Sequence, residues 1–91
     1  MNQYEALPGG NLIDEGLKDL SERRETIASL LVSIGAPRLR GLGLDLPPAF
    51  NNPEHRLYEL LARSDSDSAH SRYNALIRRL VSFEHAWPCV R

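Results

Sequence analysis

The chain has 91 residues, of which 42% are hydrophobic and 25% are charged, and its formal net charge is −1. This length predicts one domain with one hydrophobic core, and the composition excludes an intrinsically disordered chain. A charge so close to zero gives the chain as a whole no attraction for nucleic acid or anionic lipid.

The sequence indicates a protein of a reducing compartment that does not enter a membrane. No apolar stretch approaches the roughly 20 residues that span a bilayer, and the opening MNQYEALPGGN lacks both the basic start and the apolar middle of a signal peptide. The single cysteine, Cys89, cannot form an internal disulfide. We therefore expect a cytoplasmic protein.

The spacing of apolar residues predicts an all-α fold, a compact bundle of four to five helices. Between chain breakers, apolar residues recur three and four positions apart, and no segment keeps the period of two that is typical of a strand. The first helix is expected over 12–22, after the turn residues PGGN, with Asn11 as its N-cap. Residues 1–9, which precede it, are expected to be flexible.

A second helix is expected over 27–34. Thr26 is a suitable N-cap for it, and Gly35 is a typical C-terminal stop. The polar stretch between the two helices, residues 21–25, contains no glycine or proline, so one continuous helix over 12–34 is the alternative. We favour two helices.

The middle of the chain is predicted to combine two further helices with a linker. Pro37 is preorganised for the first position of a helix, so residues 37–42 are expected to form a short one. The segment 43–52 contains two prolines and two asparagines, which disfavour regular structure, and is expected to be a linker within the domain. A helix over 53–63 follows, with its proline in the first turn.

The last helix, over 68–86, is expected to organise the bundle. Its apolar residues follow a heptad-like spacing of three and four, and they are Ala69, Tyr73, Leu76, Leu80, Phe83 and Trp87. Pro88 disfavours helical backbone at the residue before it and is expected to end the helix there.

Residues 30–43, LLVSIGAPRLRGLG, invite comparison with a DNA-reading helix-turn-helix around residues 27–42. With Gly35 at the turn, such a motif needs a small residue at position 31 and an apolar residue at position 41. Leu31 and Gly41 stand there instead, so the motif is degenerate. A small DNA-binding regulator that contacts phosphates or guanine edges is the alternative hypothesis for the function. Its candidate residues are Arg38, Arg40, Arg78 and Arg79.

The residues with catalytic or metal-binding chemistry form no recognisable site. The segment DSDSAHS lacks the glycine and the glutamate that a calcium loop of the EF-hand type requires, and closeness in sequence does not give its Asp, Ser and His the geometry of a catalytic group. His85 and Cys89 are four residues apart, but Pro88 is expected to interrupt the helix that would bring them together. We expect neither an enzyme nor a metal or cofactor site.

The leading hypothesis for the function is a non-catalytic helical interaction module, a bacterial-type adaptor or regulatory subunit that binds a protein partner or a second copy of itself. Its expected contact residues are the aromatic side chains of the last helix, Tyr73, Phe83 and Trp87, because large aromatic side chains are enriched at interface hot spots. Packing of the same side chains inside the bundle is the alternative.

Overall fold

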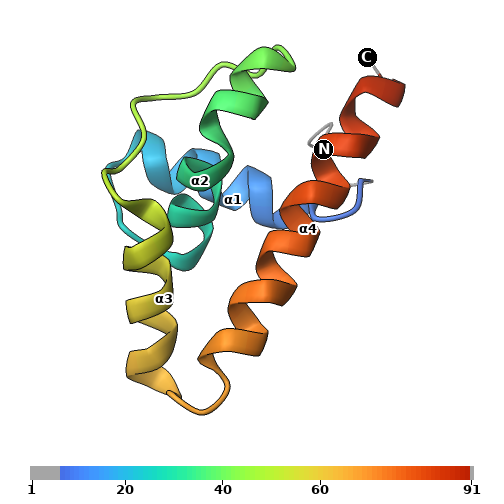
Figure 1. The fold of residues 1–91 in the computed structure, drawn as a ribbon. Helices are drawn as coiled ribbons and strands as arrows, with labels where there is room; N and C mark the ends of the chain where they lie inside the picture. Colours follow the sequence, from blue (N-terminus) through green and yellow to red (C-terminus); the bar gives the residue numbers. More distant parts are fainter. Residues whose placement is uncertain (1–6, 91) are drawn as a thin grey trace.

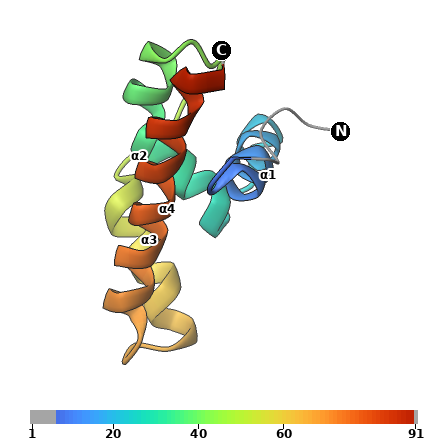
Figure 2. The same cartoon turned by 90° about the vertical axis from the view of Figure 1, so that its right-hand side faces the viewer.

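The computed structural model describes residues 7–90 of the chain, with side chains as far as Pro88. The described residues form four helices, α1 (Gly10–Ser21), α2 (Ile27–Gly41), α3 (Pro53–Ser64) and α4 (Ala69–Val90), and no strand (Figure 1). The predicted all-α fold with a long C-terminal helix is confirmed. Helix α4 lies alongside α3 in its N-terminal part and alongside α2 in its C-terminal part, and α1 crosses one side of this group (Figure 2). Within the described range, no helix combines the length and the apolar character needed to cross a membrane.

Helix α1 begins directly after Gly9, and Asn11 lies exposed inside the helix instead of at its N-cap, so that predicted cap is wrong. Gly9 has a left-handed backbone with a φ of 71°, and a Cβ atom at this position would lie 2.6 Å from the backbone oxygen of Arg79. Glycine meets both conditions because it has no side chain. The turn before α1 therefore fits closely against α4. Of the flexible start expected at residues 1–9, residues 1–6 lie outside the described range.

Helices α1 and α2 are separate, as predicted, and the alternative of one helix over 12–34 is wrong. Arg23, in the corner between them, has a positive φ of 57° that an α-helix does not contain. The Thr26 Oγ1 atom accepts a hydrogen bond from the Ser29 N–H at 3.2 Å, and the Ser29 Oγ atom accepts one from the Thr26 N–H at 2.8 Å. The Thr26 hydroxyl also donates to the buried Asp19 carboxylate at 2.7 Å. This capping box starts α2 at the predicted N-cap.

Helix α2 continues through the stop predicted at Gly35, so the separate short helix expected over 37–42 is wrong. Gly35 is buried where α2 meets α4, and a Cβ atom there would lie 2.8 Å from a methyl group of Leu80. The glycine therefore permits close packing of two helices and does not mark a helix end. Pro37 removes one backbone hydrogen bond from the helix, and the burial of Leu39 in the same turn favours its continuation.

The irregular segment between α2 and α3 spans residues 42–52 and coincides with the predicted linker. Two arginine side chains hold it through backbone carbonyls. The guanidinium of Arg40 donates to the oxygen of Pro47 at 2.9 Å, and that of Arg23 donates to the oxygen of Pro48 at 2.6 Å. The linker is thus tied to α2 and to the corner between α1 and α2.

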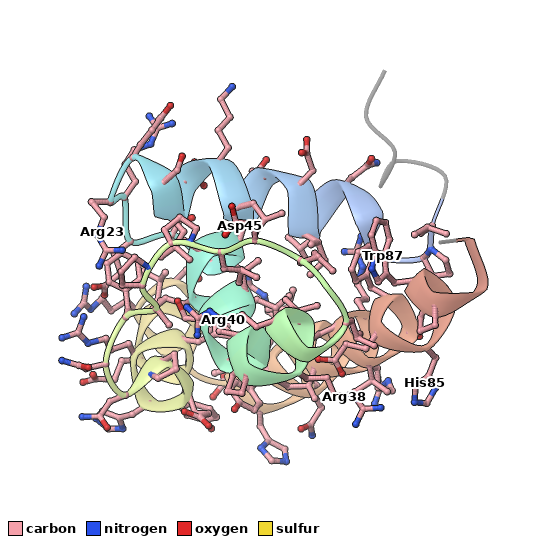
Figure 3. The ribbon with its side chains drawn as sticks, turned by 90° about the horizontal axis from the view of Figure 1, so that it is seen from above. Arg23, Arg38, Arg40, Asp45, His85 and Trp87 are labelled. Carbon is pink, nitrogen blue, oxygen red and sulfur yellow. The ribbon has the colours of Figure 1, made fainter. Side chains whose placement is uncertain are left out.

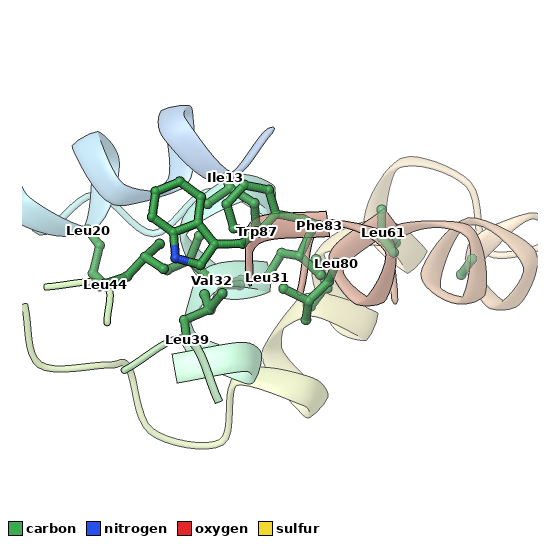
Figure 4. Close-up of a cluster of buried hydrophobic side chains, with 13 residues drawn as sticks. Ile13, Leu20, Leu31, Val32, Leu39, Leu44, Leu61, Leu80, Phe83 and Trp87 are labelled. Carbon is green, nitrogen blue, oxygen red and sulfur yellow. The ribbon is translucent and has the colours of Figure 1, made fainter. Parts of the chain in front are cut away.

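Helix α4 packs on the bundle through the predicted heptad-like seam, in which Phe83 is fully buried and Trp87 is 8% exposed (Figure 4). The Trp87 ring stacks on the Phe83 ring with centroids 5.9 Å apart, and its Nε1 atom donates to the backbone oxygen of Leu42 at 3.1 Å. The helix end predicted at Pro88 is wrong, because α4 runs to Val90. The contacts of Trp87 hold it in helical backbone against the steric preference that the following proline imposes.

Replacing Thr26 with alanine is expected to lower the free energy of unfolding by about 1–2 kcal/mol, because the N-cap of α2 and the buried Asp19 carboxylate both lose a hydrogen-bond partner. Thr26→Ser is the matched control, since it keeps the hydroxyl. Urea unfolding followed by circular dichroism measures both variants. Equal stability of the two would mean that the corner does not depend on the capping box.

Replacing Trp87 with alanine is expected to lower the free energy of unfolding by about 3 kcal/mol or more, because the loss of a buried aromatic side chain leaves a cavity. Trp87→Phe keeps an aromatic ring and loses the hydrogen bond to Leu42, so a smaller loss of about 1 kcal/mol is expected. Thermal unfolding and size-exclusion chromatography test this together. A Trp87→Ala variant with unchanged thermal stability and an altered oligomeric state would instead make Trp87 an interface residue.

Candidate functional site

A surface groove runs along one flank of α4, where the beginnings of α1 and α2 approach it. It consists of two adjoining hollows that share Ala75 and Arg79. The larger hollow, of about 510 Å³, is lined by Pro8, Gly9, Ala75, Arg78, Arg79 and Ser82. The smaller hollow, of about 210 Å³, also reaches Ile27, Arg72 and Leu76. We call this feature the α4 groove.

Helical periodicity brings the α4 residues of the groove onto one flank. Arg72, Ala75, Leu76 and Arg79 are three and four positions apart, a spacing that places side chains one above the other along a helix. Ala75 and Leu76 are half-buried, and together with Ile27 from the first turn of α2 they form an apolar floor. The short side chain of Ala75 leaves space between α4 and the turn that begins α1.

Three arginines make the rim of the α4 groove positive. Arg72 donates a hydrogen bond to the Ser64 hydroxyl at 3.0 Å. Arg78 and Arg79 are exposed, and neither forms an ion pair with an acidic side chain of the described residues. Among the described residues that line the groove, none is acidic. The groove therefore places fixed positive charge beside an apolar floor.

The four arginines predicted to contact nucleic acid do not form one surface. Arg40 donates to a backbone carbonyl of the linker at 2.9 Å. The charge of Arg38 acts on Glu84, which follows Arg79 by five positions on α4 and so lies about 140° away around the helix. Figure 3 shows Arg38 and Arg40 at separate places on the molecule. Of the four, Arg78 and Arg79 line the groove.

The helix-turn-helix considered around residues 27–42 is not formed. Such a motif needs a turn between two helices, whereas α2 is one helix over Ile27–Gly41. The glycine and proline that suggest a turn in the sequence both lie within this helix.

The aromatic side chains predicted to contact a partner lie largely inside the bundle. Phe83 and Trp87 come together in the core, where each already has a packing partner. Tyr73 is half-buried between α3 and α4, with its ring centroid 5.9 Å from that of Tyr58. None of these residues lines the α4 groove as described.

Of the residues that line the groove, only Arg78 and Arg79 were predicted from the sequence as site residues; Arg72, Ala75 and Leu76 of α4 were not. Large aromatic side chains are the usual mark of an interface in a sequence, whereas the groove is lined by arginines and by aliphatic or small side chains. A signal was available in the heptad spacing, because Arg72 and Arg79 are seven residues apart and flank the apolar seam of α4.

Glu84 is a buried acid at the contact between α4 and α2, and its residue surface is 8% exposed. Burial raises the pKa of the Glu84 carboxyl above its ordinary value, and the nearby charges of Arg38 and His85 lower it in part. Glu84 lies outside the α4 groove. Its titration therefore bears on the stability of the α2–α4 contact.

Comparisons with known proteins found no protein-family model, no curated protein and no solved structure that matches the chain. Within residues 7–90, no three side chains of His, Cys, Asp or Glu are grouped so that they could hold a metal ion.

Replacing Glu84 with glutamine is expected to raise the melting temperature at neutral pH by a few degrees. A carboxyl whose pKa is higher in the folded than in the unfolded state favours folding while it is protonated, and this contribution is lost as the pH rises through the raised pKa. The difference between variant and wild type should therefore shrink as the pH falls below the ordinary pKa of glutamate. Glu15→Gln, at an exposed position of α1, is the matched control.

Thermal unfolding across a pH series measures this difference. If Glu84→Gln instead lowers the melting temperature at neutral pH, the attraction of Arg38 outweighs the cost of burying the carboxylate, and the charged carboxylate stabilises the fold.

Proposed function

We propose that the chain is a non-catalytic helical interaction module, an adaptor or regulatory subunit, and that it binds a protein partner along the α4 groove. One observation carries this proposal: an apolar floor and three arginines face the same groove, and no described lining residue is an acid that could neutralise them. Burial of the apolar floor supplies affinity, and the charges orient and select the partner.

The shape of the groove suits a segment of protein better than a small molecule. Its α4 residues extend from Arg72 to Ser82, which corresponds to about 15 Å along the helix axis. An elongated surface beside a helix is typical of helix-in-groove recognition, whereas small-molecule sites are concave pockets that enclose most of the ligand.

A small DNA-binding regulator is the second candidate, because Arg78 and Arg79 are exposed and available to phosphate groups. Three features favour the protein partner. An apolar floor offers nothing to a phosphate backbone, and the net charge of −1 gives little general attraction for DNA. Arg38 and Arg40, which the DNA hypothesis also requires, lie away from the groove.

Selection from a random linear peptide library on the immobilised protein tests the proposal. We expect the selected peptides to be enriched in acidic and apolar residues. Their binding should weaken at least roughly tenfold with Arg79→Glu, because a central arginine is a typical hot spot. Arg63→Glu, at an exposed position of α3 outside the groove, should leave binding unchanged.

Labelled random-sequence duplex DNA at low salt is the second arm of this test. If the duplex binds through Arg78 and Arg79 with a steep salt dependence, and the library yields no peptide that needs Arg79, the DNA-binding candidate replaces the protein-binding one. Fluorescence anisotropy measures both ligands on the same scale.

A further inference from the structure

Building on the proposed function, we infer that the occupant of the α4 groove is an acidic amphipathic helix, and that two of its carboxylates, seven residues apart, pair with Arg72 and Arg79. The inferred partner is therefore helical and negatively charged, and the spacing of its two carboxylates matches that of the two arginines.

The register follows from the order of side chains along α4. Arg72 and Arg79 lie on the same flank, two helical turns or about 10.5 Å apart along the axis. Ala75 and Leu76 lie between them, three and four residues after Arg72. The groove therefore presents a charge, an apolar patch and a second charge. A partner helix laid along α4 matches this order when it has acids at positions i and i+7 and apolar residues at i+3 and i+4.

The hollows on the two sides of Ala75 provide the space for the apolar residues of the partner. Ile27 extends the apolar floor in the smaller hollow, and Pro8 and Gly9 form a wall of the larger one. Ala75, which both hollows share, has too short a side chain to fill the space beside it. Leucine-sized side chains of a partner can therefore approach the α4 backbone at this point.

A helix suits this groove better than an extended strand. Recognition of a strand relies on unpaired backbone N–H and C=O groups along a sheet edge, and the described residues contain no strand. The main wall of the groove is α4, whose backbone groups are hydrogen-bonded within the helix. A partner must therefore be recognised through side chains, and a helix projects these at the three- and four-residue spacing that the groove requires.

The charge of the occupant follows from the arginines. Arg72, Arg78 and Arg79 project from a short stretch of one helix, and neither Arg78 nor Arg79 has a carboxylate partner within the described residues. Acids on a partner relieve the repulsion between these charges and form charge-assisted hydrogen bonds with them. The bond from Arg72 to Ser64 uses its Nη1 atom, so the other N–H groups of this guanidinium remain to bind a carboxylate.

Two labelled synthetic peptides of identical composition test the inference by fluorescence anisotropy. The register peptide has Glu at i and i+7 and Leu at i+3 and i+4 in an alanine-rich helix, and the scrambled peptide distributes the same residues around the helix. We expect the register peptide to bind at least about tenfold more tightly and to gain helical circular dichroism when it binds.

A charge exchange identifies the two arginines. The double variant Arg72→Glu/Arg79→Glu should no longer bind the register peptide. It should instead bind a version of the peptide in which Lys replaces both Glu residues. Ala75→Trp should fill the floor and weaken binding without changing the charge. Arg63→Glu, outside the groove, is the control and should bind normally. Because the charge-exchanged pair gains binding, the result does not depend on a loss that unfolding could also cause.

The outcomes separate the inference from the proposed function. Equal binding of the register and scrambled peptides overturns the helical register and leaves the proposed function in place. If neither peptide binds but the library yields peptides whose binding needs Arg79, the inference fails and the proposed function stands. If the library yields no such peptide either, the inference and the proposed function both fail. A dimer that Arg79→Glu converts to a monomer in light scattering, or duplex DNA that displaces the register peptide, would make the occupant a second copy of the chain or a nucleic acid, and would overturn the inference.

Discussion

The burial of α2 on several sides at once is the constraint on which the rest of the structure depends. Leu30, Leu31 and Val32 are consecutive and fully buried, and consecutive side chains on a helix point about 100° apart. No single neighbour can cover all three, so α1, α3 and α4 must pack around α2. The same burial explains the serines of α2: the Ser33 hydroxyl donates to the oxygen of Ser29 at 2.9 Å and accepts from the N–H of Phe50 at 3.2 Å, which ties the linker to the central helix.

The elements that can be predicted from the sequence are those whose boundaries are set by adjacent residues. The start of α2 depends on the capping box of Thr26, and the start of α3 on Pro53, and both are evident locally. Gly35 and Pro88 resemble helix breakers in the sequence but lie inside helices. In both cases a contact distant in sequence decides the outcome: the approach of Leu80 at Gly35, and the hydrogen bond from Trp87 to the oxygen of Leu42 just before Pro88. Where such a tertiary contact forms, it outweighs the local preference of glycine or proline against helical backbone.

The same distinction holds for the candidate site. The amphipathic character of α4 and the seven-residue spacing of Arg72 and Arg79 are present in the sequence, and they indicate which side chains share a flank. The sequence does not indicate which flank is left uncovered, because that depends on where Ile27 and the Gly9 turn come to lie against α4. Large aromatic residues are a poor guide in a domain of this size, because its small core needs them for its own stability.

The other helices of the described residues leave one flank of α4 uncovered. Helix α4 has 22 residues, while α1 and α3 have 12 each, so the shorter helices cannot cover every side of α4 along its whole length. A wholly apolar flank would expose a continuous patch of the kind that drives aggregation. Arginine side chains border the apolar surface of Ala75 and Leu76 and limit the apolar area that the free protein exposes to water. The same guanidinium groups oppose a partner that brings only apolar surface or positive charge, because they would then be desolvated without a counter-charge. One set of side chains thus serves the solubility of the free chain and the selection of an acidic partner.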